Sequence, residues 1–91
     1  MMRINKLTDY GIVIAVRIAH DEPGRLHTAR EIAAATRVPQ PTVTRLLKQL
    51  ARSGILASTR GASGGYALAE PPEAISVARM VEALEGPIAL T

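Results

Sequence analysis

Residues 40–69 read QPTVTRLLKQLARSGILASTRGASGGYALA, and this stretch decides the fold. Its first part predicts an amphipathic helix over 40–52, because four apolar side chains recur at helical spacing: Val43, Leu46, Leu47 and Leu50. Pro41 suits the first turn of that helix, and Gly54 suits its C-terminal cap. Two short apolar runs follow, and the glycine-rich loop RGASGGY between them predicts a β-hairpin over 55–69.

The face of this predicted helix that lies opposite the leucines is basic and carries hydroxyl groups. A rotation of about 100° per residue turns three cations away from the apolar stripe, namely Arg45, Lys48 and Arg52. Thr42 and Thr44 flank them. An α-helix fits the major groove of B-DNA, where arginine binds guanine edges and threonine offers a methyl and a hydroxyl group. Basic side chains on an outer helix face are often only solvated, so the neighbouring elements must decide between the two interpretations.

Two helices are predicted before this stretch. In the sequence T-A-R-E, Thr28 and Glu31 form a capping box, which predicts a helix over about 28–37 that ends before Pro39. An earlier helix is predicted over about 6–20, and its apolar residues fall on nearly all sides. We therefore expect it to bury more than one face. Core burial is expected to account for most of its apolar residues, although Ile12, Val13 and Val16 could also pack against a partner subunit.

The last helix is predicted over about 76–85, with Ser76 as its N-cap and Gly86 at its end. A capped helix, a tight turn and a second helix with a basic outer face match the helix-turn-helix plan, and the hairpin adds a wing. We therefore predict a fold that is mainly α with a small β-hairpin. It is expected to form a single winged helix-turn-helix DNA-binding domain over 1–91.

The composition limits the chemistry that is available. The chain has 91 residues and no cysteine, which suits one small domain without a disulfide or a thiolate metal ligand. His20 and His27 lie in or near a turn, and both are predicted to be solvated, so no metal site is assigned. No apolar run approaches the length of a membrane span, and no signal-peptide pattern is present. These features favour a cytoplasmic protein without a membrane partner.

Positive charge is concentrated in the middle of the chain, although the net charge is only +3. Between residues 25 and 60 only Glu31 is acidic, whereas seven residues are basic: Arg25, Arg30, Arg37, Arg45, Lys48, Arg52 and Arg60. From Gly61 onward the balance is acidic. This distribution is typical of a protein that binds a polyanion.

The loop RGASGGY does not indicate an enzyme. It lacks the glycine spacing and the terminal Lys-Ser/Thr of a nucleotide-binding P-loop, and it leads into a strand rather than a helix. We interpret it as a wing whose glycines let the backbone approach a surface, with Arg60 able to reach phosphate or a minor groove. No Ser-His-acid arrangement is apparent, and two glutamate pairs are predicted to be solvated: Glu70/Glu73 and Glu82/Glu85. No enzymatic activity is expected.

The run LLKQLARSGILASTRGASGGYALAEPPEAISVARMVEALEG resembles the winged-helix transcription regulators of the Rrf family. The shared marks are the leucine-rich recognition helix, the glycine after it, the RG-x-x-GGY-x-L wing and a closing helix that ends in EG. The stretch LTDYGIVIAVRIA also resembles the first helix of the family, so the resemblance covers essentially the whole chain. The ending GPIALT is similar to that of regulators of the SUF iron–sulfur assembly system.

By position, the resemblance implies that Thr44 and Arg45 in the recognition helix and Arg60 in the wing read bases of a two-fold related DNA operator. Supporting contacts are expected from Gln40, Thr42, Lys48 and Ser63. Some relatives carry Glu and Gln where this chain has Thr44 and Arg45, so the preferred operator is not carried over from them.

The resemblance also implies a function, which is sequence-specific transcription regulation by a repressor linked to iron–sulfur assembly or redox stress. Cluster-binding relatives carry three cysteines beyond the closing helix, followed by a long helix that pairs two subunits. No cofactor is expected in this chain, and an iron–sulfur cluster is expected only in a longer parent protein. Likewise, we expect a homodimer for such a parent and a monomer or weak dimer for this chain. The alternative interpretation is a winged-helix protein–protein interaction module without sequence-specific DNA binding.

Overall fold

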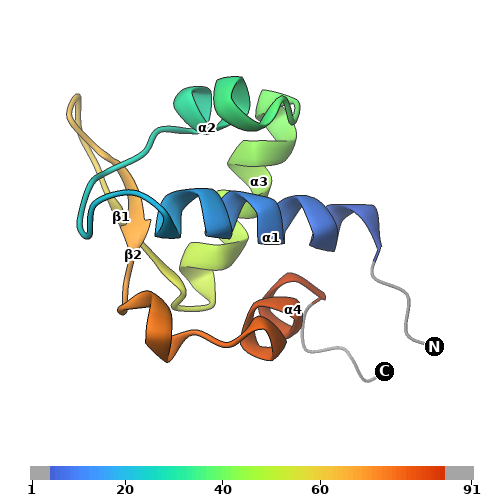
Figure 1. Cartoon of the computed structure of the whole chain (residues 1–91). Helices are drawn as coiled ribbons and strands as arrows, with labels where there is room; N and C mark the ends of the chain where they lie inside the picture. Colours follow the sequence, from blue (N-terminus) through green and yellow to red (C-terminus); the bar gives the residue numbers. More distant parts are fainter. Residues whose placement is uncertain (1–4, 86–91) are drawn as a thin grey trace.

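The computed structural model describes residues 5–85, which form four α-helices, one 3-10 turn and a two-stranded hairpin (Figure 1). In chain order these elements are α1 (Lys6–Ala19), α2 (Ala29–Thr36), α3 (Gln40–Arg52), β1 (Leu56–Thr59), β2 (Gly65–Leu68), η1 (Pro72–Ala74) and α4 (Val77–Glu85). The predicted fold class, mainly α with a small β-hairpin, is confirmed. The expected helix end at Gly86 and the GPIALT ending lie outside the described residues.

Side-chain caps mark where α1, α2 and α4 begin, and the caps of α2 and α4 are the two that were predicted. Thr28 Oγ1 accepts a hydrogen bond from the main-chain N–H of Glu31 at 3.0 Å, and Ser76 Oγ accepts one from that of Arg79 at 3.1 Å. A capping residue lies outside the helix that it caps, so α2 and α4 each begin one residue after the predicted start. In a complete capping box the Glu31 carboxylate would also accept a hydrogen bond from the main-chain N–H of Thr28. Here that carboxylate accepts one from Arg25 Nη1 instead, at 2.9 Å.

Helix α3 lies at the centre of the molecule and packs against α1, α2, α4 and β1. Its apolar stripe is enclosed, since none of its four side chains is more than 2% exposed: Val43, Leu46, Leu47 and Leu50. Around this stripe lie Ile14 and Ile18 of α1, Ile32 of α2 and Ile55. Because the stripe must face this aliphatic core, the polar side of α3 is turned outward.

Helix α1 buries one face rather than several. Ile14 is 0% exposed, whereas Val13 and Val16 are 45% and 41% exposed. The prediction that these valines are buried in the core is therefore wrong, because α2, α3 and α4 cover only part of the circumference of α1 (Figure 1). A Cβ at Gly11 would overlap the side chain of Leu84, so this glycine lets α4 approach α1 closely.

The hairpin is antiparallel and gains a third partner from the segment before α2. Its strands pair as far as Thr59, which lies opposite Gly65. His27 forms an isolated bridge with Tyr66, in which each main-chain N–H donates to the carbonyl oxygen of the other residue at 2.8 Å. This bridge holds the loop end of β2 against the connection between α1 and α2.

His27 is buried rather than solvated, which corrects the prediction made from the sequence. Its side chain is 1% exposed, and its Nδ1 lies 3.2 Å from Glu31 Oε2 and 3.5 Å from Arg25 Nη1. Asp21 Oδ2 lies 3.8 Å from His27 Nε2. The backbone bridge to Tyr66 places His27 against β2, and this contact joins residues that are far apart in the sequence.

Candidate nucleic-acid interface

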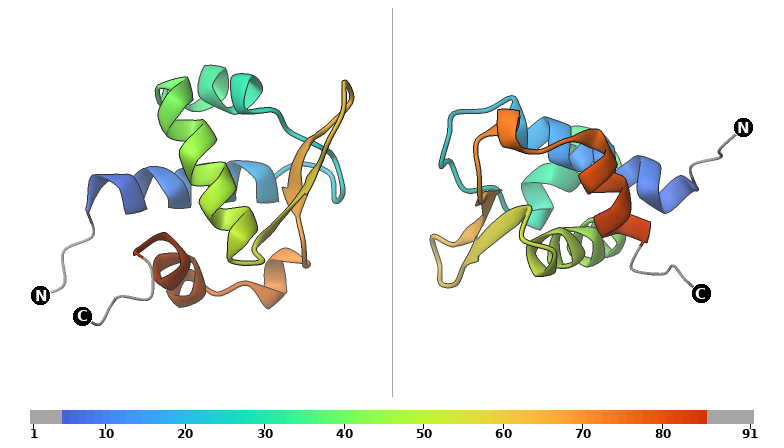
Figure 2. Two further views of the ribbon diagram at one scale, coloured as in Figure 1. Left: turned by 180° about the vertical axis from the view of Figure 1, so that it is seen from behind. Right: turned by 90° about the horizontal axis from the view of Figure 1, so that it is seen from below.

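The outer face of α3 carries most of the side chains predicted to bind DNA. Gln40, Arg45 and Lys48 are exposed, and Thr42 and Thr44 are half-buried beside them. In the left view of Figure 2, α3 crosses the near side of the molecule with the hairpin next to it. The helix and the hairpin therefore share one side of the protein.

The loop between β1 and β2 needs its glycines for the path of the backbone. Gly61 has a φ of 111°, which is in the left-handed region, and a Cβ at Gly64 would overlap the carbonyl oxygen of Thr59. The N–H of Gly64 donates to the carbonyl oxygen of Gly61 at 3.0 Å and closes a tight turn. Arg60 and Ser63 lie on this turn and are exposed. The loop thus presents one cation and one hydroxyl group on a narrow tip.

An open groove of about 540 Å³ lies between the C-terminal half of α3 and the hairpin. Three cations line this groove, which we name the basic groove: Lys48, Arg52 and Arg60. Hydroxyl groups line its hairpin side, from Ser58, Thr59 and Tyr66. None of its lining residues in the described part of the chain is acidic. Cationic and hydroxyl side chains are the groups that bind the phosphates of a nucleic-acid backbone.

The cations of this surface have no carboxylate partner within residues 5–85, unlike the arginines beside the acidic segments. The unpaired set consists of Arg45, Lys48, Arg52 and Arg60. By contrast, Arg79 Nη1 lies 2.7 Å from Glu70 Oε1, and this hydrogen bond lowers the pKa of the Glu70 carboxyl group. Glu70 was predicted to be only solvated and is instead an ion-pair partner. The positive charge on α3 and the wing remains available to an anion.

The structure divides the predicted site residues into two groups, apart from Ser63 on the loop between β1 and β2. Lys48 and Arg60 come together in the basic groove, although they are on different elements. The other predicted residues of α3 lie towards its N-terminal end, outside the groove: Gln40, Thr42, Thr44 and Arg45. Arg52 was not included in the predicted site, yet it lines the groove one helical turn after Lys48. The i, i+4 spacing of these two cations was the signal that could have identified it.

The described residues offer no place for a metal cofactor. No group of three or more histidine, aspartate and glutamate side chains in residues 5–85 could hold a metal ion. An iron–sulfur cluster needs cysteine thiolates, and this sequence contains none, so its residues do not fit such a group. None of the helices that the structure describes is both long and apolar enough to cross a membrane.

The packed helices, the outward face of α3 and the adjoining wing define a winged helix-turn-helix protein. Residues 4–91 match the Rrf2 family, described as an iron-dependent transcriptional regulator. An rrf2-like HTH-type transcriptional regulator of Rhodobacter capsulatus is 37% identical over 76 residues, which are 84% of this chain and 50% of that protein. The HTH-type transcriptional regulator CymR of Bacillus subtilis is 31% identical over 87 residues, which are 96% of this chain and 63% of CymR. The chain belongs to the Rrf2 family of transcriptional regulators, whose members are not enzymes.

Solved structures agree with this assignment. CymR of B. subtilis, described as the global cysteine regulator, matches with a TM-score of 0.87 at 30% identity, over 100% of this chain and 70% of CymR. IscR of T. potens matches with a TM-score of 0.83 at 27% identity, over 99% of this chain and 66% of IscR. The chain spans between half and about two thirds of the length of the curated relatives it matches.

Proposed function

We propose that this chain is the DNA-binding domain of a sequence-specific transcription regulator whose partner is a double-stranded DNA operator. The proposal rests on one observation: the exposed outer face of α3 leads directly into the basic groove beside the wing. A helix in the major groove and a wing on the adjoining backbone would use both features at once. Membership of a family of transcriptional regulators supports the same conclusion.

The two groups of site residues have different roles in this proposal. Thr44 and Arg45 read base edges, because the N-terminal half of a recognition helix is the part that enters the major groove. Gln40 and Thr42 make supporting contacts at the same end. Arginine can bind guanine through two hydrogen bonds, and the methyl group of threonine can contact that of thymine.

The basic groove holds the sugar-phosphate backbone beside the major groove. Lys48 and Arg52 approach it from α3, and Arg60 approaches it from the hairpin. Arg60 also has the position from which a wing arginine enters the flanking minor groove. Ser63 donates a hydrogen bond to a phosphate from the tip of the wing.

We further propose that the bound protein represses transcription by covering a promoter, in response to iron–sulfur assembly or redox stress. The description of the family as iron-dependent supports a link to iron, and the description of CymR as the global cysteine regulator supports one to a sulfur-containing amino acid. Because this chain contains no cysteine, any cluster that senses the signal belongs to a longer parent protein. That parent is proposed to bind as a homodimer, whereas this chain alone is a monomer or weak dimer.

Selection of bound DNA from a random pool tests the proposal. We expect one enriched sequence, present in two half-sites about 10 base pairs apart, or a multiple of that distance, if two copies bind together. Placing the enriched sequence over a reporter promoter should lower expression if the protein is a repressor. A pool without any enriched sequence would contradict operator binding and favour the protein–protein interaction module.

A further inference from the structure

Arg37 lies in the turn between α2 and α3 and has a left-handed backbone conformation, with φ 63° and ψ 19°. Within residues 5–85 it is the only residue other than glycine with a positive φ. The remaining positive φ angles belong to glycines: Gly24, Gly54, Gly61 and Gly65. The chain thus uses glycine for this conformation everywhere else that the structure describes.

The turn between α2 and α3 requires the left-handed conformation but does not require an arginine. The N–H of Arg37 donates to the carbonyl oxygen of Ala33 at 2.8 Å, and the next residue, Val38, is only 6% exposed. In this conformation a Cβ crowds the backbone, whereas glycine adopts it without that cost. A glycine would therefore serve the turn better than the arginine that is present.

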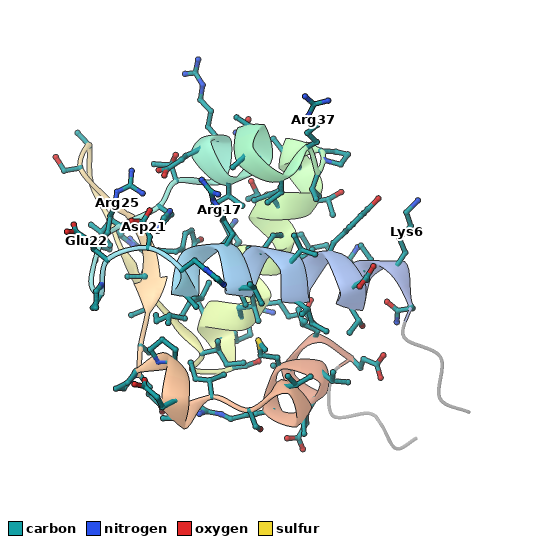
Figure 3. The ribbon with its side chains drawn as sticks, viewed as in Figure 1. Lys6, Arg17, Asp21, Glu22, Arg25 and Arg37 are labelled. Carbon is teal, nitrogen blue, oxygen red and sulfur yellow. The ribbon has the colours of Figure 1, made fainter. Side chains whose placement is uncertain are left out.

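The side chain of Arg37 does not stabilise the turn either. It is exposed, and within residues 5–85 it forms neither a salt bridge nor a side-chain hydrogen bond. Figure 3 shows it at the junction of α2 and α3, pointing away from the body of the protein. Gln40, the first residue of α3, follows three positions later. The guanidinium therefore stands beside the end of α3 that the proposed function places in the major groove.

We propose that Arg37 binds a backbone phosphate of the operator at the point where α3 enters the major groove. This contact is the reason that an arginine occupies a position whose conformation favours glycine. The inference rests on the proposed function and extends it to a residue on a different element from the recognition helix. An unpaired guanidinium is suited to a phosphate, and such a contact orients a helix in the groove without reading a base. Backbone strain that a glycine at the same position would relieve is commonly retained for a functional contact.

The substitution Arg37→Gly tests this inference because it should change stability and DNA binding in opposite directions. The melting temperature should rise by about 3–8 °C, since the glycine relieves the strain. Affinity for the selected operator should fall by about tenfold. The slope of log K against log salt should become shallower by about one, because one phosphate contact is lost. Random DNA should lose affinity to the same extent.

Two control variants separate the side-chain charge from other effects. Arg37→Lys keeps the charge and the backbone strain, so it should retain most of the affinity and the salt slope. Arg17→Gln removes one positive charge from α1, which packs against the buried side of α3, and should leave the salt slope unchanged.

Each outcome of this experiment decides one point. Unchanged affinity and slope for Arg37→Gly, together with a loss for Arg45→Ala, would overturn the inference and leave the proposed function intact. A lower melting temperature for Arg37→Gly would overturn the premise that the turn favours glycine. Failure of the unmodified chain to bind DNA would overturn the proposed function itself, and this result is distinct from the other two.

Discussion

The side-chain amide of Gln49 donates a hydrogen bond of 2.7 Å to the main-chain carbonyl oxygen of Leu84. A second hydrogen bond, of 3.1 Å, joins the same amide to the carbonyl oxygen of Ala83. Gln49 belongs to α3, and both carbonyls belong to the last turn of α4, where the helix leaves its acceptors unsatisfied. These two hydrogen bonds therefore hold α3, the recognition helix, against the end of α4. Gln49 faces away from the proposed DNA surface.

Loss of the two hydrogen bonds of Gln49 should lower the stability of the fold. Gln49→Ala removes both hydrogen bonds and should reduce the free energy of unfolding by about 1–2 kcal/mol. Thermal and urea unfolding measure the change. Gln40→Ala is the matched control on the same helix, because Gln40 is exposed and should affect DNA affinity rather than stability. Equal stability of the unmodified chain and Gln49→Ala would show that these hydrogen bonds do not stabilise the fold.

Arg45 and Lys48 should differ in the kind of DNA binding that they support. Arg45→Ala should cost about 1–3 kcal/mol on the selected operator and relax the preference at one base position. Lys48→Ala should weaken selected and random DNA alike, because Lys48 lies in the basic groove and contacts phosphate. Titration of both variants with both DNAs measures this difference. A uniform loss for Arg45→Ala would contradict its role in base reading.

Arg52 should contact a DNA phosphate, although it was not among the site residues predicted from the sequence. Arg52→Gln should make the slope of log K against log salt shallower by about one, without altering the sequence that a random pool yields. Binding measured between about 0.05 and 0.2 M salt gives the slope. The same slope for Arg52→Gln and the unmodified chain would exclude Arg52 from the interface.

Gly65 should be less replaceable than Gly61, although both have positive φ angles of 152° and 111°. A Cβ at Gly65 would lie 2.7 Å from the carbonyl oxygen of His27, whereas nothing lies within 4 Å of one at Gly61. Gly65→Ala should therefore separate the wing from the segment before α2 and lower both stability and DNA affinity. Gly61→Ala should lower the free energy of unfolding by only about 1 kcal/mol, which is the cost of a positive φ at alanine. Hydrogen exchange of the Tyr66 amide, which bonds to His27, reports whether the bridge survives.

Stability should fall in acid, in part because of the Glu70–Arg79 ion pair. The hydrogen bond and the charge of Arg79 lower the pKa of Glu70 from its ordinary value of 4.5. The unfolded chain, with the higher pKa, takes up this proton first as the pH falls. The stabilisation is therefore fully present above about pH 4.5 and is lost as the pH falls through the lower value of the folded state.

The substitution Arg79→Gln isolates this contribution. Urea unfolding of this variant and of the unmodified chain should differ at about pH 7, and the difference should shrink as the pH falls below the ordinary glutamate pKa of 4.5. The remaining acid sensitivity should persist in the variant, because the pKa values of two other carboxyl groups are also lowered. The main-chain N–H of Glu22 and then Arg25 lower that of Asp21, and Arg25 lowers that of Glu31. A difference that stays constant across this range would rule out the ion pair as its source.

Local patterns in the sequence were sufficient for much of the fold. The leucine stripe of 40–52 specified both the helix and its buried side, since a helix can hide only one such stripe. Thr28, Ser76 and Gly54 marked helix ends through backbone groups only a few residues away. The glycines of RGASGGY specified a tight hairpin for the same local reason. The basic outer face of α3 followed directly from the position of the leucines.

Contacts between distant residues could not be obtained in this way. His27 is buried and its backbone pairs with Tyr66. The side chain of Gln49 bonds to the end of α4, more than 30 positions away. Val13 is exposed although its apolar neighbour Ile14 is buried, since the placement of α2 and α4 decides which side of α1 is covered.

The sequence by itself thus determined the helices, the hairpin and the cations of the proposed DNA surface, because these depend on spacing along one element. Only the tertiary structure decided that Lys48, Arg52 and Arg60 share one groove, since that depends on how the hairpin packs beside α3. It also decided that Arg37 is strained, because the left-handed turn is imposed by the packing of two helices and not by the arginine itself.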